Sequence, residues 1–317
     1  IIGMLVIVSI LLYWPFYIGF QSQAAGVLPN IFYPTRIEQF MVMFGVLLVP
    51  VVGWLIWETI KHRDWDKWRL GVYVGIGTLM FLILASVALS ALIFTQAGLE
   101  GVKYSIFGVL SGEVVISEVA KRRIIEDPWT AVFLTAILVV CASLAMSIVN
   151  KSRVKPRVRP FVLLLLFTGC LLTLAPEFLF LRDSFGARMN TIFKFYYQAW
   201  MLWSIVASYG IWRVSYYARS GVAVLYGTFV YVVLCSGLIY SVFSLWSKTQ
   251  GFSGATIVGG NRIITLDGTA YLQEVNKSDY DAIKWINHFL YDDGVIAEAI
   301  GGSYSEYARI STHTGLT

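Results

Sequence analysis

Five charged side chains crowd the stretch APEFLFLRDSFGARMNTIFKFYYQAW (175–200), which lies between two long apolar runs; they are Glu177, Arg182, Asp183, Arg188 and Lys194. Arginine offers a two-pronged donor to phosphate oxygens and lysine a point charge. A carboxylate can act as a general base or hold a divalent cation. The set therefore indicates recognition of an anionic phosphate, with Glu177 and Asp183 as candidate catalytic groups and Mg²⁺ or Mn²⁺ as a candidate cofactor.

Asn190, Lys194 and Tyr197 follow one another at helical spacing and share one face of a helix. An ionisable group a turn inside a membrane helix is costly unless it is paired or reaches water, so Lys194 is a candidate binding residue. A second explanation needs no ligand. Lys194 would then extend to the interface, and the arginines and carboxylates would form interfacial ion pairs.

Composition places these residues in a membrane protein. Of the 317 residues 57% are hydrophobic and only 14% are charged, which is too apolar for a soluble domain. The net charge of +5 is therefore interpreted as membrane topology rather than as a nucleic-acid signal. The three cysteines lie in apolar runs without paired spacing and indicate neither a disulfide framework nor a zinc site.

The predicted fold is mainly α, a polytopic bundle of about seven transmembrane helices over 1–246. A span needs about 20 predominantly apolar residues. The chain starts at Ile1 with a truncated span and without a cleavage signal, so we interpret it as an internal fragment. The expected spans are 1–14, 39–58, 70–94, 128–149, 161–181, 192–212 and 221–246.

Basic residues concentrate in the alternate loops 58–69, 150–160 and 213–219. The positive-inside rule assigns these loops to the cytoplasm. The connections 15–38, 95–127 and 182–191 then lie outside, together with everything after 247. The run Lys121, Arg122, Arg123 contradicts the rule, but long loops obey it poorly, and 113–127 is typical of a helix on the membrane surface.

The region 247–317 is predicted to form part of an extracytoplasmic α/β module. A helix starts near Ser278, VIAEAI (295–300) is interpreted as a buried strand, and a second helix follows Gly301 and Gly302. Glu298 at the strand end and Arg309 are candidate binding residues, although the glycines alone could serve a tight turn. Arg36, in the polar and aromatic outer loop 15–38, is a further candidate, and a plain interfacial loop explains that pattern equally well.

Three stretches resemble one family. LLYWPFYIGFQSQAAGVLPN with PTR (11–36), PEFLFLRDSFGARMNTIFKFYYQAW (176–200) and EAIGGSYSEYARISTHTGL (298–316) look like the YYY-type polytopic membrane proteins of bacteria and archaea, an uncharacterised family. That family is similar to membrane glycosyltransferases of the C-type fold. The resemblance implies hexosyl transfer from a polyprenyl-phosphate sugar donor at the outer face of the cytoplasmic membrane.

The resemblance also assigns roles. It implies that Arg182, Arg188 and Lys194 hold the lipid-linked phosphate, while Glu177 and Asp183 position the acceptor or a cation. The principal acidic residue of C-type enzymes, in the first outer loop, has no counterpart here. We expect it upstream of Ile1, so this part of the chain alone would be inactive.

Two other classes of function fit the same charges. A transporter or flippase of lipid-linked sugars would use them without chemistry, and inverted repeats, which are not visible here, would favour it. A non-catalytic subunit would use the spans and the outer module as a scaffold. Large apolar patches on that module would point to this reading.

Overall fold

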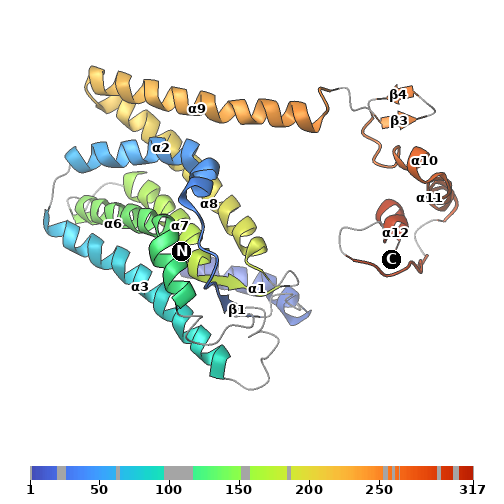
Figure 1. Ribbon diagram of the computed structural model, residues 1–317, viewed down its shortest axis with the longest axis horizontal. Coiled ribbons are helices and arrows are strands. Elements are labelled where there is room, and N and C mark those ends of the chain that lie inside the picture. Colours follow the sequence, from blue (N-terminus) through green and yellow to red (C-terminus); the bar gives the residue numbers. More distant parts are fainter. Residues whose placement is uncertain are drawn as a thin grey trace. The chain divides into compact units, whose positions relative to one another are not determined.

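The computed structural model describes residues 2–19, 26–61, 65–95, 117–150, 158–183, 187–252, 256–258, 261–263, 265–290, 294–302 and 307–316. It is mostly helical, and it divides into two compact units, 1–236 and 237–317, each described by itself (Figure 1). The helices of the first unit are α1 (Ile2–Gly19), α2 (Ile37–Lys61), α3 (Trp65–Thr95), the π-helical turn η1 (Lys121–Glu126), α6 (Trp129–Asn150), α7 (Val158–Phe178) and α8 (Met189–Tyr217), and α9 (Ser220–Lys248) begins in it.

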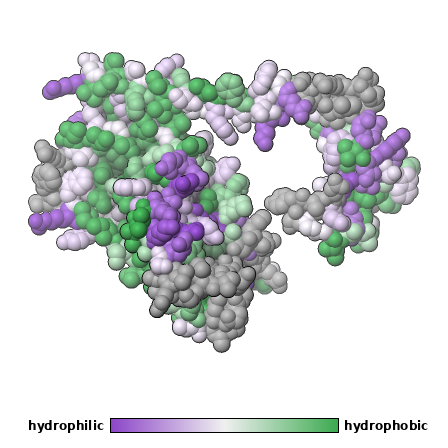
Figure 2. Space-filling model, viewed as in Figure 1, coloured by the Kyte–Doolittle hydropathy of each residue, from purple (hydrophilic) through white to green (hydrophobic). Residues whose placement is uncertain are grey.

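Within the described residues, five helices are long and apolar enough to cross a membrane: α2, α3, α6, α7 and α9. Hydrophobic residues cover much of the visible surface of the helical part (Figure 2), as expected of a protein whose outer faces contact lipid. The chain therefore has the architecture of an integral membrane protein.

Each of the seven predicted windows falls on a helix, but two of these helices are not among the five that qualify as spans over the described residues. In α1 the apolar stretch found among the described residues is Ile7–Phe16. Helix α8 carries polar and charged residues along its length, among them Asn190, Lys194, Gln198 and Arg213, which lower its hydropathy. Seven spans thus stay a prediction, and five are supported.

The core of the first unit lies between α2, α6, α7 and α8. Its centre is aromatic: Phe44 packs edge-on against Tyr196 and Trp203, with ring centres 5.2 and 5.0 Å apart. Such edge-to-face pairs stabilise a core beyond the area that they bury. This packing fixes α8 against α2 and so determines where the first turn of α8 lies.

Helices α3 and α6 approach each other closely because α3 carries glycine at two positions four residues apart, Gly71 and Gly75. A Cβ atom on Gly71 would lie 2.6 Å from the carbonyl oxygen of Val139 and 2.9 Å from the backbone nitrogen of Ser143. Small residues at this spacing let membrane helices pack backbone to backbone.

We expect Gly71→Ala to lower the stability of the first unit by about 1–3 kcal/mol, because the clashing atoms belong to the α6 backbone and no rotamer change relieves the overlap. Gly77→Ala on the same helix is the matched control, since a Cβ there meets nothing within 4 Å. Thermal unfolding in detergent measures both variants. Equal midpoints would contradict the tight contact.

A short antiparallel pair joins the connection between α1 and α2, which is predicted to lie outside and is called the outer connection below, to the end of α7. Strand β1 (Val27–Pro29) pairs with β2 (Leu179–Leu181), with Leu28 opposite Phe180. Helix α7 continues through Pro176 and ends at Phe178. The pair brings the chain around Asn30 next to the end of α7.

The second unit contains a hairpin of β3 (Thr256–Val258) and β4 (Asn261–Ile263), followed by α10 (Leu272–Val275), α11 (Lys277–Phe289) and α12 (Arg309–Thr314). The helix predicted from Ser278 is present as α11, with Asn276 as its cap. The strand predicted over 295–300 is not found: this segment is neither helix nor strand, and Val295 and Ile300 are 89% and 100% exposed. An apolar run forms a strand only where a neighbouring strand pairs with it. The predicted α/β module is not confirmed in that form.

The surface helix predicted over 113–127 is helical where the structure describes it, from 117 to 126. Its last turn, η1, closes with a bond from the Asp127 amide to the Arg122 carbonyl oxygen. Such π-helical turns often occur at functional sites. Here the turn carries Arg122 and Arg123 to the first outer connection.

Candidate functional site

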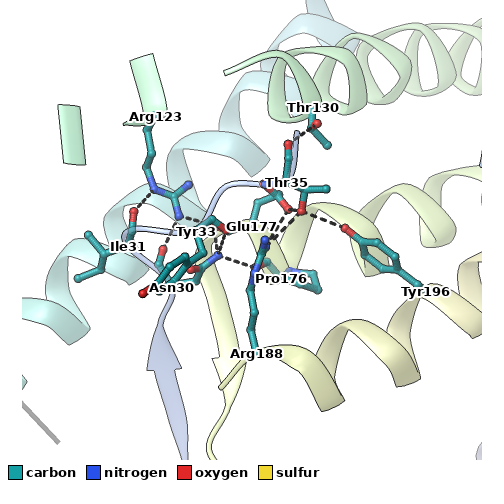
Figure 3. A network of polar contacts seen from close by, with 10 residues as sticks. All are labelled: Asn30, Ile31, Tyr33, Thr35, Arg123, Thr130, Pro176, Glu177, Arg188 and Tyr196. Atoms are coloured by element: carbon teal, nitrogen blue, oxygen red, sulfur yellow. Dashed lines mark hydrogen bonds and ion pairs between the residues drawn. The ribbon is translucent and has the colours of Figure 1, made fainter. Parts of the chain in front are cut away.

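Glu177 lies in the last turn of α7 and is 1% exposed. Its Oε2 accepts from the Thr35 amide at 2.8 Å, and its Oε1 accepts from the Thr35 hydroxyl and from Arg188 Nη1, the latter at 3.2 Å. Figure 3 shows these contacts converging on the carboxylate. Both oxygens of this buried carboxylate are therefore engaged, as the burial of a charge requires.

Asn30 fastens the outer connection to the end of α7. Its side-chain amide donates to the carbonyl oxygens of Tyr33, Pro176 and Glu177 at 3.0, 3.1 and 3.1 Å. The last carbonyls of a helix have no partner within the helix, so this amide supplies what the end of α7 lacks. Thr130, in the first turn of α6, adds a bond from its hydroxyl to the Thr35 carbonyl oxygen at 2.6 Å.

Arg123 enters the same network from η1. Its Nε donates to the Ile31 carbonyl oxygen at 2.8 Å, and its Nη2 donates to the carbonyl oxygens of Glu177, at 2.6 Å, and Asn30. Its guanidinium lies 5.0 Å from the ring centre of Phe178. Burial lowers the pKa of Arg123 to about 10, with the Glu177 charge opposing and the Arg188 charge adding to the decrease. Arg123 is therefore a cation at neutral pH.

The network holds two cations and one anion. Arg188 uses its Nη1 on Thr35, Pro176 and Glu177. Within the described part of the chain, Arg188 Nε and Nη2 and Arg123 Nη1 make no hydrogen bond. The carboxylate of Glu177 pairs with Arg188, whereas Arg123 contacts Glu177 through its backbone carbonyl oxygen. One positive charge and three donor atoms thus remain for an anionic partner.

Two grooves meet this network. One, of about 570 Å³, has mostly apolar walls from α3, η1 and α6, and Arg123, Asp127 and Glu177 lie along it. We call it the α3–α6 groove; its apolar lining includes Leu79, Ile83, Val87, Ile124, Ala131 and Val132. The other, of about 550 Å³, is lined by the connection 29–33, Phe180, Arg188 and the start of α8.

The predicted site residues do not all come together. Glu177 and Arg188 form the ion pair described above. Asp183 accepts a hydrogen bond from Asn190 at 2.7 Å. Arg182 is exposed, and its backbone amide donates to the Gly26 carbonyl oxygen at 2.9 Å.

The remaining predicted residues of the first unit point away from Glu177. Lys194 and Tyr197 are exposed on α8, and Tyr197 packs on Phe193 with ring centres 4.8 Å apart. Arg36 is exposed, with its Nε 3.9 Å from Asp127 Oδ1. The predicted functional face of α8 through Lys194 and Tyr197 is thus not the face that meets the network. The buried neighbour Tyr196 meets it, with its hydroxyl 3.4 Å from Thr35 Oγ1.

Glu298 and Arg309 belong to the second unit and support its own fold. Glu298 accepts from the amides of Ile310 and Ser311, both at 3.0 Å, at the start of α12. Hydrogen bonds from Ser311 lower the pKa of Glu298 below its usual value. Arg309 pairs with Asp279 of α11, Nη1 to Oδ2, at 2.8 Å.

Sequence reasoning missed Thr35, Arg123, Thr130 and Tyr196. The basic run at 121–123 was the available signal for Arg123, because it breaks the positive-inside pattern on the predicted outer side. The two threonines had no such signal, since their roles depend on contacts with residues about 95 and 142 positions away. As for the candidate cation, the described residues contain no group of three or more His, Cys, Asp or Glu side chains that could hold a metal.

Comparison with known proteins gives one match. The model of a family described as "Uncharacterized membrane protein (DUF2298)" matches residues 1–203, which include the whole Glu177 network. No curated protein and no solved structure matches the chain. The resemblance to YYY-type proteins and to C-type glycosyltransferases is not supported by these comparisons and stays a prediction. The chain belongs to the family of uncharacterized membrane proteins DUF2298.

Proposed function

We propose that this protein is a membrane glycosyltransferase that takes a sugar from a polyprenyl-phosphate donor at the outer face of the cytoplasmic membrane. The observation that carries the proposal is the α3–α6 groove, whose apolar walls end at a buried cluster with one excess positive charge. A lipid-linked phosphate has the matching chemistry, an apolar tail joined to an anionic head.

The walls of the groove suit the tail. Leu79, Ile83 and Val87 of α3 face it, and its side-chain hydroxyls on α3 include Ser90, which donates to the Ser86 carbonyl oxygen at 2.7 Å. A hydroxyl satisfied in this way leaves little polar surface to resist an isoprenoid chain. Burial of apolar area would then hold the donor in place.

The end of the α3–α6 groove at Arg123 suits the phosphate of the donor. Arg123 lines it and keeps Nη1 without a hydrogen bond in the described part of the chain, while its other donors hold backbone carbonyls. A guanidinium held in place by the protein loses little entropy when it binds an anion. Arg188, on the other side of Glu177, would bind the negative charge of the same phosphate or donate hydrogen bonds to the sugar (Figure 3).

In the proposed reaction an acceptor hydroxyl oxygen bonds to the anomeric carbon of the sugar, and the bond from that carbon to the phosphate oxygen breaks. The polyprenyl phosphate leaves with the electron pair, and the hydroxyl proton passes to a carboxylate. Asp183, which contacts Asn190 at the start of α8, is the candidate for that carboxylate. Glu177 has both oxygens engaged by Thr35 and Arg188, which suits a group that positions Arg188 and the chain at Thr35 better than a base.

A carrier of lipid-linked sugars is the second candidate, because it would need the same groove and the same charges but no proton acceptor. The two functions differ at Asp183. A carrier tolerates Asp183→Asn, whereas the transferase loses turnover.

The test is sugar transfer by the full-length protein in membranes, from a labelled polyprenyl-phosphate hexose to endogenous acceptors. Val87→Trp narrows the α3–α6 groove, and we expect about a tenfold or greater loss of transfer because tail contacts worth about 1.4 kcal/mol or more are lost. Ile76→Trp is the matched control on α3, exposed to a similar degree but outside the groove lining.

Three outcomes decide the proposal. Loss of transfer in Val87→Trp and Asp183→Asn, with Ile76→Trp active and expression equal, supports a transferase. If the donor binds to all forms and none of them transfers the sugar, a carrier replaces the transferase as the proposed function. Equal activity of Val87→Trp and Ile76→Trp would remove the α3–α6 groove from the donor site.

A further inference from the structure

A second buried carboxylate, Glu58, lies at the opposite end of the helices that hold Glu177. It is fully buried in the last turns of α2, with Oε1 2.7 Å from Nη1 of Arg159 and Oε2 3.8 Å from Nε of Arg213. Arg159 lies in the first turn of α7 and Arg213 near the end of α8. The ends of three helices therefore meet at one place, on the face predicted to be cytoplasmic.

Two cations here have no close carboxylate among the described contacts. Lys61, three residues after Glu58, extends over the Trp57 ring, with its Nζ 4.8 Å from the ring centre. Arg213 reaches Glu58 only at 3.8 Å, whereas Arg159 holds that carboxylate at 2.7 Å. A phosphate would give Lys61 and Arg213 a close anionic partner.

Buried donors also lack partners here. Arg213 Nε, Trp54 Nε1 and Thr59 Oγ1 are inaccessible and make no hydrogen bond within the described part of the chain. Almost all buried polar atoms in proteins find a partner, and those that do not often mark the place of a water or a ligand. These three side chains lie within two turns of α2 and on the facing part of α8.

Aromatic rings frame the cations. The Arg213 guanidinium lies 4.1 Å from the ring centre of Tyr217, and Lys61 Nζ lies 5.9 Å from the same ring. Tyr217 is 46% exposed and Lys61 is exposed, so the cluster can be reached from outside. Tyrosine and tryptophan settle at headgroup depth in membranes. The cations are thus held where a lipid headgroup would lie.

We infer that the cluster of Lys61, Arg159 and Arg213, called the inner basic cluster, binds the phosphate of an anionic phospholipid headgroup. The cluster ends apolar helices rather than a soluble surface, and the cytoplasmic leaflet is rich in anionic lipid. Arg213 and Lys61 would donate to the phosphate oxygens, and Tyr217 would cover the glycerol side. This inference is independent of the proposed sugar transfer.

The experiment titrates the full-length protein in neutral detergent with short-chain phosphatidylglycerol, short-chain phosphatidylcholine and inorganic phosphate, each alone. Retained lipid is counted by native mass spectrometry, and the thermal midpoint is measured. We expect phosphatidylglycerol alone to be retained and to raise the midpoint. Lys61→Gln should weaken retention about tenfold without unfolding, because Lys61 is exposed.

Arg213→Gln should weaken retention further, and Arg219→Gln is the matched control, an exposed cation on the same predicted face that no described contact joins to the cluster. Equal loss in Lys61→Gln and Arg219→Gln would overturn the site in favour of diffuse surface charge. Equal stabilisation by inorganic phosphate would overturn the lipid and leave a free-anion site. Retention of phosphatidylcholine as tight as that of phosphatidylglycerol would show that charge does not select the ligand.

Discussion

Replacement of Glu177 by glutamine is expected to lower the free energy of unfolding of the first unit by about 3–5 kcal/mol, because it takes the paired carboxylate from Arg188 and removes the negative charge near Arg123. Glutamine keeps the shape, but its side-chain nitrogen would face donors where the carboxylate accepts from Thr35 and Arg188. Thermal or chemical unfolding of the detergent-solubilised protein measures the loss.

Two companion variants make this result specific. Glu118→Gln removes a carboxylate from an exposed pair with Arg122, Oε1 to Nε at 2.6 Å, and should cost no more than about 1 kcal/mol. Glu177→Gln combined with Arg188→Gln should regain part of the loss, because the excess charge is removed with its partner. If the double variant is as unstable as the sum of the single variants, the pair is not coupled.

Replacement of Arg123 by glutamine should weaken binding of polyprenyl phosphate about 10- to 100-fold, because charged hydrogen bonds to the phosphate are worth about 1.5–3 kcal/mol. This prediction rests on the proposed donor site. It is measured by titration of the full-length protein in detergent with a fluorescent polyprenyl phosphate.

Arg122→Gln is the matched control, since Arg122 is the neighbouring cation of η1. It pairs with Glu118 and donates to the Phe32 carbonyl oxygen, but it does not contact Glu177. Arg123 also holds the carbonyls of the outer connection, so Arg123→Lys is needed as a variant that keeps the charge. Binding that is weak in Arg123→Gln, intermediate in Arg123→Lys and normal in Arg122→Gln supports the phosphate site. Equal binding by all four proteins would contradict it.

The helices were predictable because they depend on local composition. Apolar runs of about 20 residues located α2, α3, α6, α7 and α9, and the basic loops predicted that Lys61, Arg159 and Arg213 share one face. The contacts of Glu58 with both arginines agree with the second prediction. The apolar runs and the positions of the basic residues were sufficient to predict these features.

The site was only half predictable because it depends on contacts between distant segments. Glu177 and Arg188 stand out as charges between apolar runs, and the structure joins them. The choice of Tyr197 over Tyr196 could not be made from spacing, since adjacent residues on a helix differ by 100° and either face could turn inward. The packing of Phe40 and Phe44 against Tyr196 decides it.

The same limit explains the missing strand at 295–300. VIAEAI has the apolar run of a buried strand, but pairing depends on a neighbour that a local pattern does not supply. A helix forms its backbone hydrogen bonds within itself and can be recognised from its own sequence. A strand forms them with a neighbouring strand and cannot be recognised in this way.

The glycine contact between α3 and α6 holds the two helices close together at one end of α3. At Gly71 and Gly75 the two helices touch backbone to backbone, whereas the groove residues Ser86 and Ser90 lie roughly 16–23 Å further along α3 at 1.5 Å per residue. Because a helix is stiff, a small tilt of α3 at this contact produces a larger displacement further along the helix. We therefore expect the width of the α3–α6 groove near Ser86 and Ser90 to change when Gly71 or Gly75 is substituted, although neither glycine lines it.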